Sequence, residues 1–351
     1  MATTLSRAAV LLGALVVTAC ATADPRYTAA TPPMVLAPAS AAGVQDVRGI
    51  YREALRRRLP ASGPACDDVL RRLPGERPPA AASTPTPMAA LARRYRVGFV
   101  PGFMAECAWP IISPFSDVRA ALAAAGFDAR ILRVGGRGST VENAERLARL
   151  IADPPDDPRP FILVGYSKGL IDVLELAVSQ PAALDRVAAV VSVAGASNGS
   201  PFADQFNRAY RLWLARLPMP ACQRGTGQEI DDLRRDVRLE WWRRHAAAVT
   251  VPIFALVTAP RRERISPLMW PVYRTLARVE PRNDGNLLWY DQVPPGARLL
   301  GYLDADHWTV ATPFAQELPL GSALFHDAVP RTAVIEAALE VIDRSLPTPV
   351  R

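Results

Sequence analysis

Side chains that bind metals are scarce in this sequence of 351 residues, which contains only three histidines and four cysteines. The cysteines show no C-x-x-C spacing and the histidines are scattered, so the sequence supports no metal site, and we expect no cofactor. No cysteine lies on a sharp turn between a strand and a helix, which disfavours a cysteine nucleophile. Lysine is scarcer still, because Lys168 is the only lysine among 41 basic residues.

The basic residues outnumber the acidic ones, and the formal net charge is +7. The arginines that cause this excess are spread along the whole chain, and no nucleic-acid-binding module is recognisable among them. We therefore expect no nucleic-acid partner. The charge indicates a solvated surface or, at a cell envelope, contact with anionic lipid.

The first apolar run extends from Ala8 to Ala19 and follows Arg7. It is shorter than the about 20 residues that span a bilayer, and it is typical of a signal peptide. Its end resembles a bacterial lipobox, in which cleavage leaves Cys20 as the lipidated first residue. Ordinary cleavage after Ala21 or Ala23 is the alternative. We expect an exported lipoprotein, anchored on the periplasmic face of the envelope at the outer membrane.

Composition divides the chain into segments. Residues 1–20 are assigned to the signal peptide, and residues 21–43, rich in Ala, Thr and Pro, to a flexible tether. Residues 44–92 predict an N-terminal helical segment with a Pro-rich linker. Residues 93–351 are long enough for one α/β domain with a sizeable core. Within that domain, residues 201–251 form an insertion rich in aromatic residues and arginine.

Strand and helix patterns alternate along the domain, which predicts a mainly parallel sheet covered by helices on both faces. We expect strands at 97–100, 128–134, 161–164, 188–193, 252–258 and 297–303. We expect helices at 114–125, 140–151, 170–177 and 331–346, with further helical patterns at 44–59 and 66–73. Ser139 and Glu142 have the spacing of a capping box, which would start the second helix of the domain.

The most informative motif is G-x-S-x-G at residues 165–169, directly between an apolar strand and a helical pattern. A serine on so sharp a turn presents its hydroxyl at the top of the sheet, beside a helix N-terminus. The two glycines leave room for the neighbouring strand and helix, where a Cβ would collide. This context predicts that Ser167 is a catalytic nucleophile.

A serine hydroxyl needs a base to remove its proton, and histidine is the usual one. His307 follows the strand-like residues 297–303, where the base belongs if the order is Ser, Asp, His. His326, close to the final helix, is the second candidate. His245 lies in a basic helical pattern that favours a solvated ring. We therefore predict His307 as the base.

The acid that orients the imidazole should follow the predicted strand 252–258, and Asp284 is the best candidate. Its Asn-Asp-Gly setting is also ordinary turn chemistry. Both interpretations can hold, because a turn at a strand end is where this carboxylate must lie. Asp291 is the rival. Asp306 is disfavoured, because a side chain adjacent in sequence seldom reaches its neighbour's Nδ1.

Residues 165–169, the turn at 283–285 and His307 together resemble the bacterial secreted lipase and esterase branch of the α/β-hydrolase superfamily. Residues 97–103 are similar to that family's strand and His-Gly-Phe segment, and residues 195–204 resemble its Pro-His-x-Gly-Ser-x-x-Ala-Asp segment. The family's histidines are replaced in both segments, which bears on the substrate more than on the chemistry.

The resemblance implies the α/β-hydrolase fold, with the insertion 201–251 as a helical lid. It also implies an oxyanion hole made by the backbone amides of Lys168 and Phe103, with Met104 as the neighbouring choice. An aromatic lid would exclude water and bind an acyl chain. Simple packing of the insertion on the sheet edge is the alternative.

The Lys168 side chain stands in the first turn of a helix, where a cation opposes the macrodipole and needs a partner. One hypothesis is that it meets an anionic group of the substrate or an acidic lid residue, Asp231 or Asp232. An exposed side chain is the alternative.

With Cys20 assigned to the anchor, three cysteines remain, and an oxidising compartment would allow one disulfide among them. Two pairings are attractive. Cys107 can pair with Cys222, which joins the loop beside Phe103 to the insertion, or Cys66 can pair with Cys107.

We therefore predict a membrane-anchored serine hydrolase that cleaves carboxylic esters, with an ester or lipid as substrate, through an acyl-enzyme and a Ser-Asp-His triad. One alternative is an envelope acyltransferase or thioesterase that uses the same triad. Another is a lipoprotein that keeps the fold as a non-catalytic binding module.

Overall fold

The computed structural model describes residues 45–73, 76, 84–109, 112–219 and 221–346. The predicted signal peptide, Cys20 and the tether lie outside the described residues, as does most of the Pro-rich linker. Within the described ranges, no helix combines the length and the apolarity that crossing a membrane requires.

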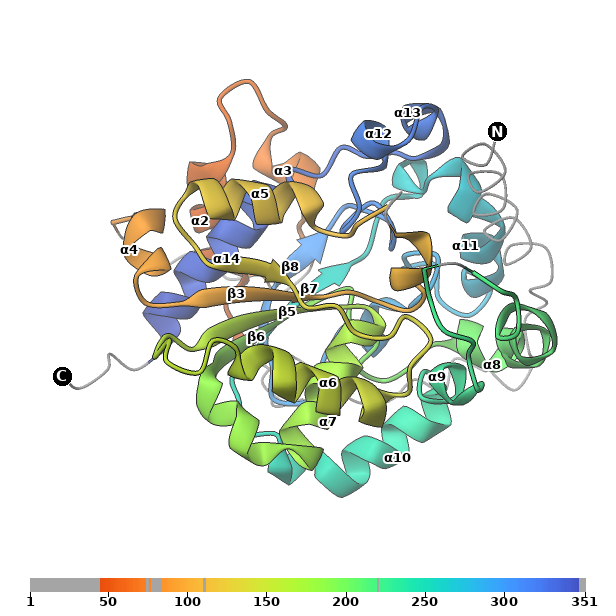
Figure 1. The fold of residues 1–351 in the computed structure, drawn as a ribbon. Helices are drawn as coiled ribbons and strands as arrows, with labels where there is room; N and C mark the ends of the chain where they lie inside the picture. Colours follow the sequence, from red (N-terminus) through yellow and green to blue (C-terminus); the bar gives the residue numbers. More distant parts are fainter. Residues whose placement is uncertain (1–44, 74–75, 77–83, 110–111, 220, 347–351) are drawn as a thin grey trace.

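The described residues form one eight-stranded sheet in the order β1-β8-β7-β6-β5-β3-β4, with β2 also pairing with β8 (Figure 1). All pairings are parallel except that between β2 and β8, so the predicted mainly parallel sheet is confirmed. The strands are β1 (Gln45–Asp46), β2 (Leu70–Arg71), β3 (Arg96–Val100), β4 (Ala129–Ile131), β5 (Phe161–Tyr166), β6 (Val187–Val193), β7 (Ile253–Thr258) and β8 (Arg298–Leu303).

Helices cover both faces of the sheet, as predicted (Figure 1). One face carries α2 (Arg48–Arg58), α4 (Met88–Ala92), α5 (Ser116–Ala124) and α14 (Arg331–Ser345). The other face carries α6 (Thr140–Ala152), α7 (Lys168–Ser179) and α10 (Arg235–His245). The shorter helices are α3 (Cys66–Val69), α8 (Pro201–Ala209), α9 (Gln228–Asp231), α11 (Trp270–Leu276), α12 (Phe314–Glu317) and α13 (Gly321–Leu324).

The hydrophobic core is divided by the sheet. Along β5, Ile162 and Val164 belong to the cluster under α2 and α14, whereas Phe161 and Leu163 belong to the cluster under α6 and α7. Successive side chains of a strand point to opposite faces, so a strand buried on both sides reads as a continuous apolar run. This is why the run before the G-x-S-x-G motif predicted a central strand.

The start of α6 is fixed by the predicted capping box. The Ser139 hydroxyl accepts a hydrogen bond from the Glu142 amide at 3.3 Å, and the Glu142 carboxylate accepts one from the Ser139 amide at 2.9 Å. Two backbone donors that the first helical turn leaves without partners are satisfied in this way.

The N-terminal segment belongs to the core. β1 and β2 both pair with β8, and Tyr51 and Leu55 of α2 are fully buried. The helical prediction for residues 66–73 was wrong at its end, because α3 stops at Val69 and the next two residues form β2. The side of β8 that faces away from β7 offers backbone partners there, and strand pairing replaces the helix.

Candidate active site

The serine of the G-x-S-x-G motif stands on a sharp turn between β5 and α7. Ser167 has a φ of 53° and a ψ of −122°, a backbone conformation that L residues rarely adopt unless the surrounding structure enforces it. A Cβ at Gly169 would lie 2.1 Å from the Val100 carbonyl oxygen, and one at Gly165 would lie 2.8 Å from the Cα of Leu170. Only glycine fits at these two positions, so the tightness of the turn explains both glycines of the motif.

The structure brings together the three residues that the sequence analysis grouped. His307 Nε2 lies 2.9 Å from the Ser167 hydroxyl oxygen, and His307 Nδ1 lies 2.9 Å from Asp284 Oδ2. Ser167 comes from the end of β5, and His307 lies on the loop that follows β8. The serine is partly exposed, whereas the histidine and the aspartate are buried. The arrangement gives a hydroxyl, an imidazole and a carboxylate in one hydrogen-bonded line.

Asp284 is held by donors on both of its carboxylate oxygens. Oδ1 accepts the backbone amides of residues 286–287 at 2.9 and 2.7 Å. Oδ2 accepts the Thr258 hydroxyl at 2.5 Å and the Gln292 side-chain amide at 3.3 Å, besides its bond with His307. The Gln292 side chain is fixed in turn by the backbone amide and carbonyl of Thr258. These donors fix the position of the carboxylate beside the imidazole.

The loop that carries His307 is fastened at three points. Tyr166, next to the serine, donates its hydroxyl to the His307 carbonyl at 2.7 Å, and the His307 amide donates to the Asp284 carbonyl at 2.9 Å. Asp306 accepts the Thr309 amide and hydroxyl, both at 2.9 Å, together with the Ser266 amide. Asp306 therefore holds the backbone of the loop and does not orient the imidazole.

The rival residues lie elsewhere. His326 is exposed, and the ring of His245 packs against Trp241 on α10. Asp291 is fully buried and accepts a hydrogen bond from Arg235 Nε at 3.0 Å. Burial raises the pKa of Asp291 to about 7.

The loop after β3 borders the serine, as an oxyanion hole requires. A Cβ at Gly102 would lie 2.9 Å from that of the serine. The Met104 amide is committed to the Gly136 carbonyl at 2.8 Å. The amides of Phe103 and Lys168, by contrast, have no acceptor among the described residues. The geometry thus favours Phe103 over Met104 as the partner of the Lys168 amide.

Both interpretations of the Lys168 side chain, the contact with a substrate or lid carboxylate and the exposed position, were wrong. The Lys168 ammonium group lies 2.6 Å from Asp172 Oδ1, one turn along α7, and both side chains are 1% exposed. Asp172 Oδ2 accepts the Asn143 side-chain amide at 2.9 Å, and burial raises the pKa of Asp172 to about 6. Asp232 instead accepts the Thr140 amide, and Asp231 pairs with Arg211. The ammonium group is buried and paired with Asp172, so it does not reach a substrate.

The insertion reaches the site through aromatic side chains. The rings of Phe103 and Tyr210 have centroids 5.2 Å apart, and Phe206 and Phe202 continue the row along α8 at 6.0 and 5.1 Å. At its other end, the Trp241 ring nitrogen on α10 donates to Glu175 of α7 at 2.8 Å. The insertion therefore packs on the helix layer and also contacts the loop beside the serine.

A disulfide joins Cys107 to Cys222. This is one of the two pairings that the sequence left open, and Cys66 takes no part in it. The bond connects the loop after β3 to the insertion. Among the described residues, no group of three or more His, Cys, Asp or Glu side chains is placed to hold a metal ion.

Three supporting residues were missed by sequence analysis. Thr258 is the last residue of a predicted strand, and a polar residue at the carboxyl end of a parallel strand was an available signal. Tyr166 occupies the variable position before the serine in the motif, which carries no signal of its own, although its ring lies 5.3 Å from that of His307. Gln292 gave no signal, because its role depends on a contact 34 residues away.

The comparisons with known proteins agree with this geometry. The chain is similar to a solved structure, the metagenomic carboxyl esterase MGS0156, with 34% sequence identity and a TM-score of 0.82, over 91% of this chain and 98% of that one. It also shares its fold with the mature lipase BlEst2 of Bacillus licheniformis, at 20% identity and a TM-score of 0.51, over 65% of this chain and 89% of that one. No family model and no curated protein sequence matches the chain.

Proposed function

Because this chain belongs to the family of the carboxyl esterase MGS0156 and has the α/β-hydrolase fold, we propose that it hydrolyses carboxylic esters with Ser167 as nucleophile. The observation that carries the proposal is the line of hydrogen bonds from the Ser167 hydroxyl through His307 to Asp284. This is the arrangement that lets an imidazole take a serine proton as the hydroxyl attacks a carbonyl.

In the first half of the reaction, His307 Nε2 accepts the proton of the Ser167 hydroxyl while the oxygen bonds to the ester carbonyl carbon. Asp284, already hydrogen-bonded to Nδ1, keeps the imidazole in the tautomer that accepts at Nε2 and stabilises the imidazolium. The imidazolium then gives its proton to the leaving alkoxide. An alcohol departs, and the acyl group remains on the serine.

Negative charge develops on the carbonyl oxygen in this step, and backbone amides can stabilise it. The amides of Phe103 and Lys168 border the serine and have no acceptor among the described residues. Each such donor is worth about 2.7–4 kcal/mol of transition-state stabilisation in other enzymes. In the second half, His307 takes a proton from water as the water oxygen bonds to the acyl carbon. The bond from that carbon to the Ser167 oxygen then breaks, the acid is released, and His307 returns the proton to the serine.

The partly exposed Phe103 ring, backed by the buried rings of Tyr210 and Phe206, supports an apolar acyl group as the part of the substrate beside the insertion. Aromatic side chains bury large apolar areas, so they favour hydrocarbon over hydrated groups. We extend the proposal to lipid-like esters on this basis, and the insertion is its proposed lid.

The test is labelling with a fluorophosphonate probe together with hydrolysis of p-nitrophenyl esters of increasing chain length. Wild-type protein should be labelled and active, and Ser167→Ala and His307→Ala should lose labelling and roughly 10⁴-fold or more of kcat. His326→Ala is the matched control, because that histidine is exposed and outside the site. A folded wild-type protein that neither reacts with the probe nor cleaves any ester of the series would refute the proposal.

The proposal places this activity at the cell envelope, with Cys20 as the lipid-modified residue. Support comes from the sequence of the first 20 residues alone. Metabolic labelling with a palmitate analogue tests it: the wild type should be labelled and Cys20→Ala should not. Equal labelling of the two would refute the anchor without touching the esterase proposal.

A further inference from the structure

The short loop Gly135–Gly138, which follows β4, meets the oxyanion side of the site through Gly136. Its carbonyl accepts the Met104 amide at 2.8 Å, and its amide donates to the Glu106 carboxylate at 2.7 Å. A Cβ on Gly136 would lie 3.1 Å from the Glu106 nitrogen and 3.2 Å from the Met104 Cα. The loop is therefore packed directly against the residues that follow Phe103.

The same loop is linked to α7 indirectly, through its first residue and Asn143 of α6. The Gly135 amide donates to the Asn143 side-chain oxygen at 2.8 Å, and the Asn143 side-chain nitrogen donates both to the Gly135 carbonyl and to Asp172. Asp172 is the partner of Lys168, whose amide is the other proposed oxyanion donor. Loop 135–138 therefore contacts residues beside both proposed oxyanion donors. It is bonded to Met104 and Glu106, which follow Phe103, and to Asn143, which is bonded to the side-chain partner of Lys168.

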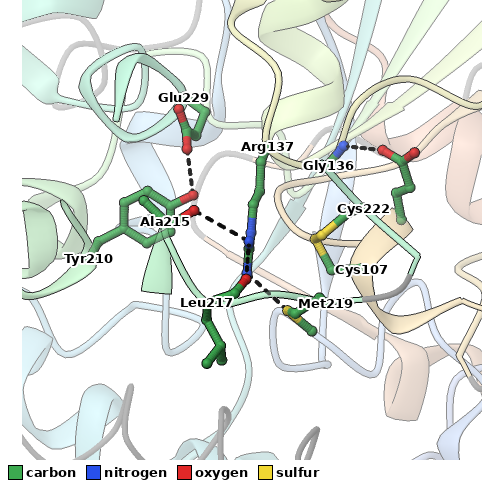
Figure 2. The surroundings of a disulfide bond; sticks show 10 residues. Cys107, Gly136, Arg137, Tyr210, Ala215, Leu217, Met219, Cys222 and Glu229 are labelled. Carbon is green, nitrogen blue, oxygen red and sulfur yellow. Dashed lines mark hydrogen bonds between the residues drawn. A yellow bond between two sulfur atoms is a disulfide. The ribbon is translucent and has the colours of Figure 1, made fainter. Parts of the chain in front are cut away.

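The third contact of the loop is with the insertion, through Arg137 (Figure 2). This side chain is 1% exposed. Its Nη1 donates to the carbonyls of Leu217 at 2.8 Å and of Ala215 at 3.4 Å, and its Nη2 lies 2.9 Å from the Met219 sulfur. Its Nε has no hydrogen-bond partner among the described residues. A buried guanidinium held by two carbonyls and a thioether, with no carboxylate of the described residues bonded to it, is a costly way to stabilise a fold.

The disulfide is a second tie between the same two parts of the molecule. Figure 2 shows the Cys107–Cys222 bond beside Arg137 and the segment 215–219. Cys107 stands next to Glu106, the residue bonded to Gly136. The insertion is therefore fastened to the oxyanion side twice, once covalently and once through a buried cation.

We propose that Arg137 is a positioning residue for the oxyanion hole, acting in parallel with the Cys107–Cys222 disulfide. Both fasten the insertion to the residues that follow Phe103, and so hold the Phe103 amide where the oxyanion forms. The inference rests on the proposed esterase function. An oxyanion donor is effective only within a few tenths of an ångström of its ideal place, so loss of its supports should lower kcat more than it raises KM.

The experiment compares Arg137→Met, Cys107→Ser/Cys222→Ser and the combined variant, with kcat per active site counted by fluorophosphonate titration. Each single change leaves one tie in place, and kcat should fall by less than about fivefold. The combined variant should lose roughly 30-fold or more, beyond the product of the separate effects, with KM within about twofold. Counting sites removes any contribution from misfolded protein.

The matched control is Arg96→Met. Arg96 is also fully buried and donates to the carbonyls of Arg159, Asp153 and Ile151, but it lies at the opposite end of β3 from the oxyanion side. It should lower stability and leave kcat per labelled site unchanged. Arg137→Lys, which keeps a buried donor group, should recover part of the turnover in the Cys107→Ser/Cys222→Ser background.

The outcomes separate the two proposals. An active wild type whose combined variant keeps its kcat per labelled site, or changes only in KM, overturns the positioning role and leaves the esterase intact. The positioning role is also overturned if Arg96→Met lowers kcat per labelled site as much as the combined variant does. A wild type without labelling or ester hydrolysis overturns the proposed function, and this inference with it. If the combined variant does not fold, kcat per labelled site is compared between Arg137→Met and Arg137→Lys under a reducing agent that opens the disulfide. A lower value for Arg137→Met supports the positioning role, and equal values overturn it.

Discussion

The two sides of the Ser167 hydroxyl are held by different means. On the acid–base side, Asp284 accepts bonds from Thr258 at the end of β7, from Gln292 and from its own turn. On the oxyanion side, the loop after β3 depends on loop 135–138, a disulfide and a buried arginine. The first set of contacts belongs to the sheet and its connections, and the second reaches into the insertion.

The difference lies in which elements carry the bonded residues, because the sequence separations are long on both sides. Ser167 and His307 are 140 residues apart, and the disulfide joins residues 115 apart. Ends of adjacent parallel strands meet wherever the sheet forms, so the acid–base side is assembled by folding of the core. The oxyanion side is complete only when the insertion has docked. Changes in the insertion should therefore alter oxyanion stabilisation and leave proton transfer intact.

The largest effect is expected from breaking the acid–base side itself. Asp284→Asn keeps the volume but removes the charge that holds the imidazole tautomer, and kcat should fall about 10⁴-fold. Steady-state hydrolysis of a p-nitrophenyl ester measures it, with circular dichroism to check folding. Asp291→Asn, the rival acid bonded to Arg235, is the control and should keep wild-type turnover. The reverse ranking of the two variants would contradict the assignment.

The next largest effect is expected from breaking the buried ion pair between Lys168 and Asp172 on α7, the helix that follows Ser167. Lys168→Met leaves Asp172 buried without a cation, which should lower the free energy of unfolding by about 3–5 kcal/mol. Lys168→Met/Asp172→Asn removes both charges and should be clearly milder. Urea unfolding of the two variants measures the ordering. Because the ammonium group is buried, the ratio of activity on anionic and neutral esters should stay unchanged, and a selective loss on anionic esters would restore the rejected hypothesis.

Much of the acid–base side could be predicted from the sequence, because its residues stand in local patterns. The glycines around Ser167 mark the end of β5, and His307 follows the end of β8, whereas the Asn-Asp-Gly turn at Asp284 lies 26 residues beyond Thr258, the last residue of β7. Parallel strands bring their carboxyl ends to one edge, so the order of the motifs was enough to group these residues. The structure places them within hydrogen-bond distance of one another.

The oxyanion side could not be predicted in the same way. Nothing in the sequence around Arg137 announces a contact with Leu217, 80 residues away, and the cysteine spacing left two pairings open. Neither interpretation of Lys168 included its actual partner, Asp172, one turn ahead on the same helix, because nothing in the local sequence indicates that this pair is buried. Long-range side-chain contacts leave no periodic signal in a single sequence.

A smaller effect is expected from weakening the support of Asp284. The Thr258 hydroxyl lies 2.5 Å from Asp284 Oδ2 and 2.9 Å from the Gln292 side-chain oxygen, and its single proton goes to the closer acceptor, the carboxylate. Thr258→Val removes this donor and should lower kcat about tenfold, the kinetic equivalent of roughly 1.4 kcal/mol. Thr258→Ser keeps the hydroxyl and should stay near wild type. If valine and serine behave alike, the hydroxyl does not support the carboxylate.

The smallest effect concerns a contact that crosses between the two sides, the pair of Asp291 with Arg235 at the start of α10 in the insertion. Burial raises the pKa of Asp291 from 3.8 to about 7. Between these two values the folded protein keeps a proton that the unfolded chain has lost. The free energy of unfolding contributed by this group therefore falls as the pH rises from about 4 to about 7, and is constant outside that window.

Asp291→Asn cannot titrate, so it isolates this contribution while every other group cancels between variant and wild type. The unfolding free energy of the variant minus that of the wild type should increase from pH 4 to pH 7 and then level off. Urea unfolding at half-unit steps of pH measures the difference. A difference that stays constant would mean that Arg235 keeps Asp291 ionised throughout, and the insertion would then be held to the acid–base side by a permanent ion pair. A rising difference instead means that Asp291 is protonated below about pH 7, so that its contact with Arg235 is not an ion pair there. The buried cation that holds the insertion is then the one on the oxyanion side, Arg137.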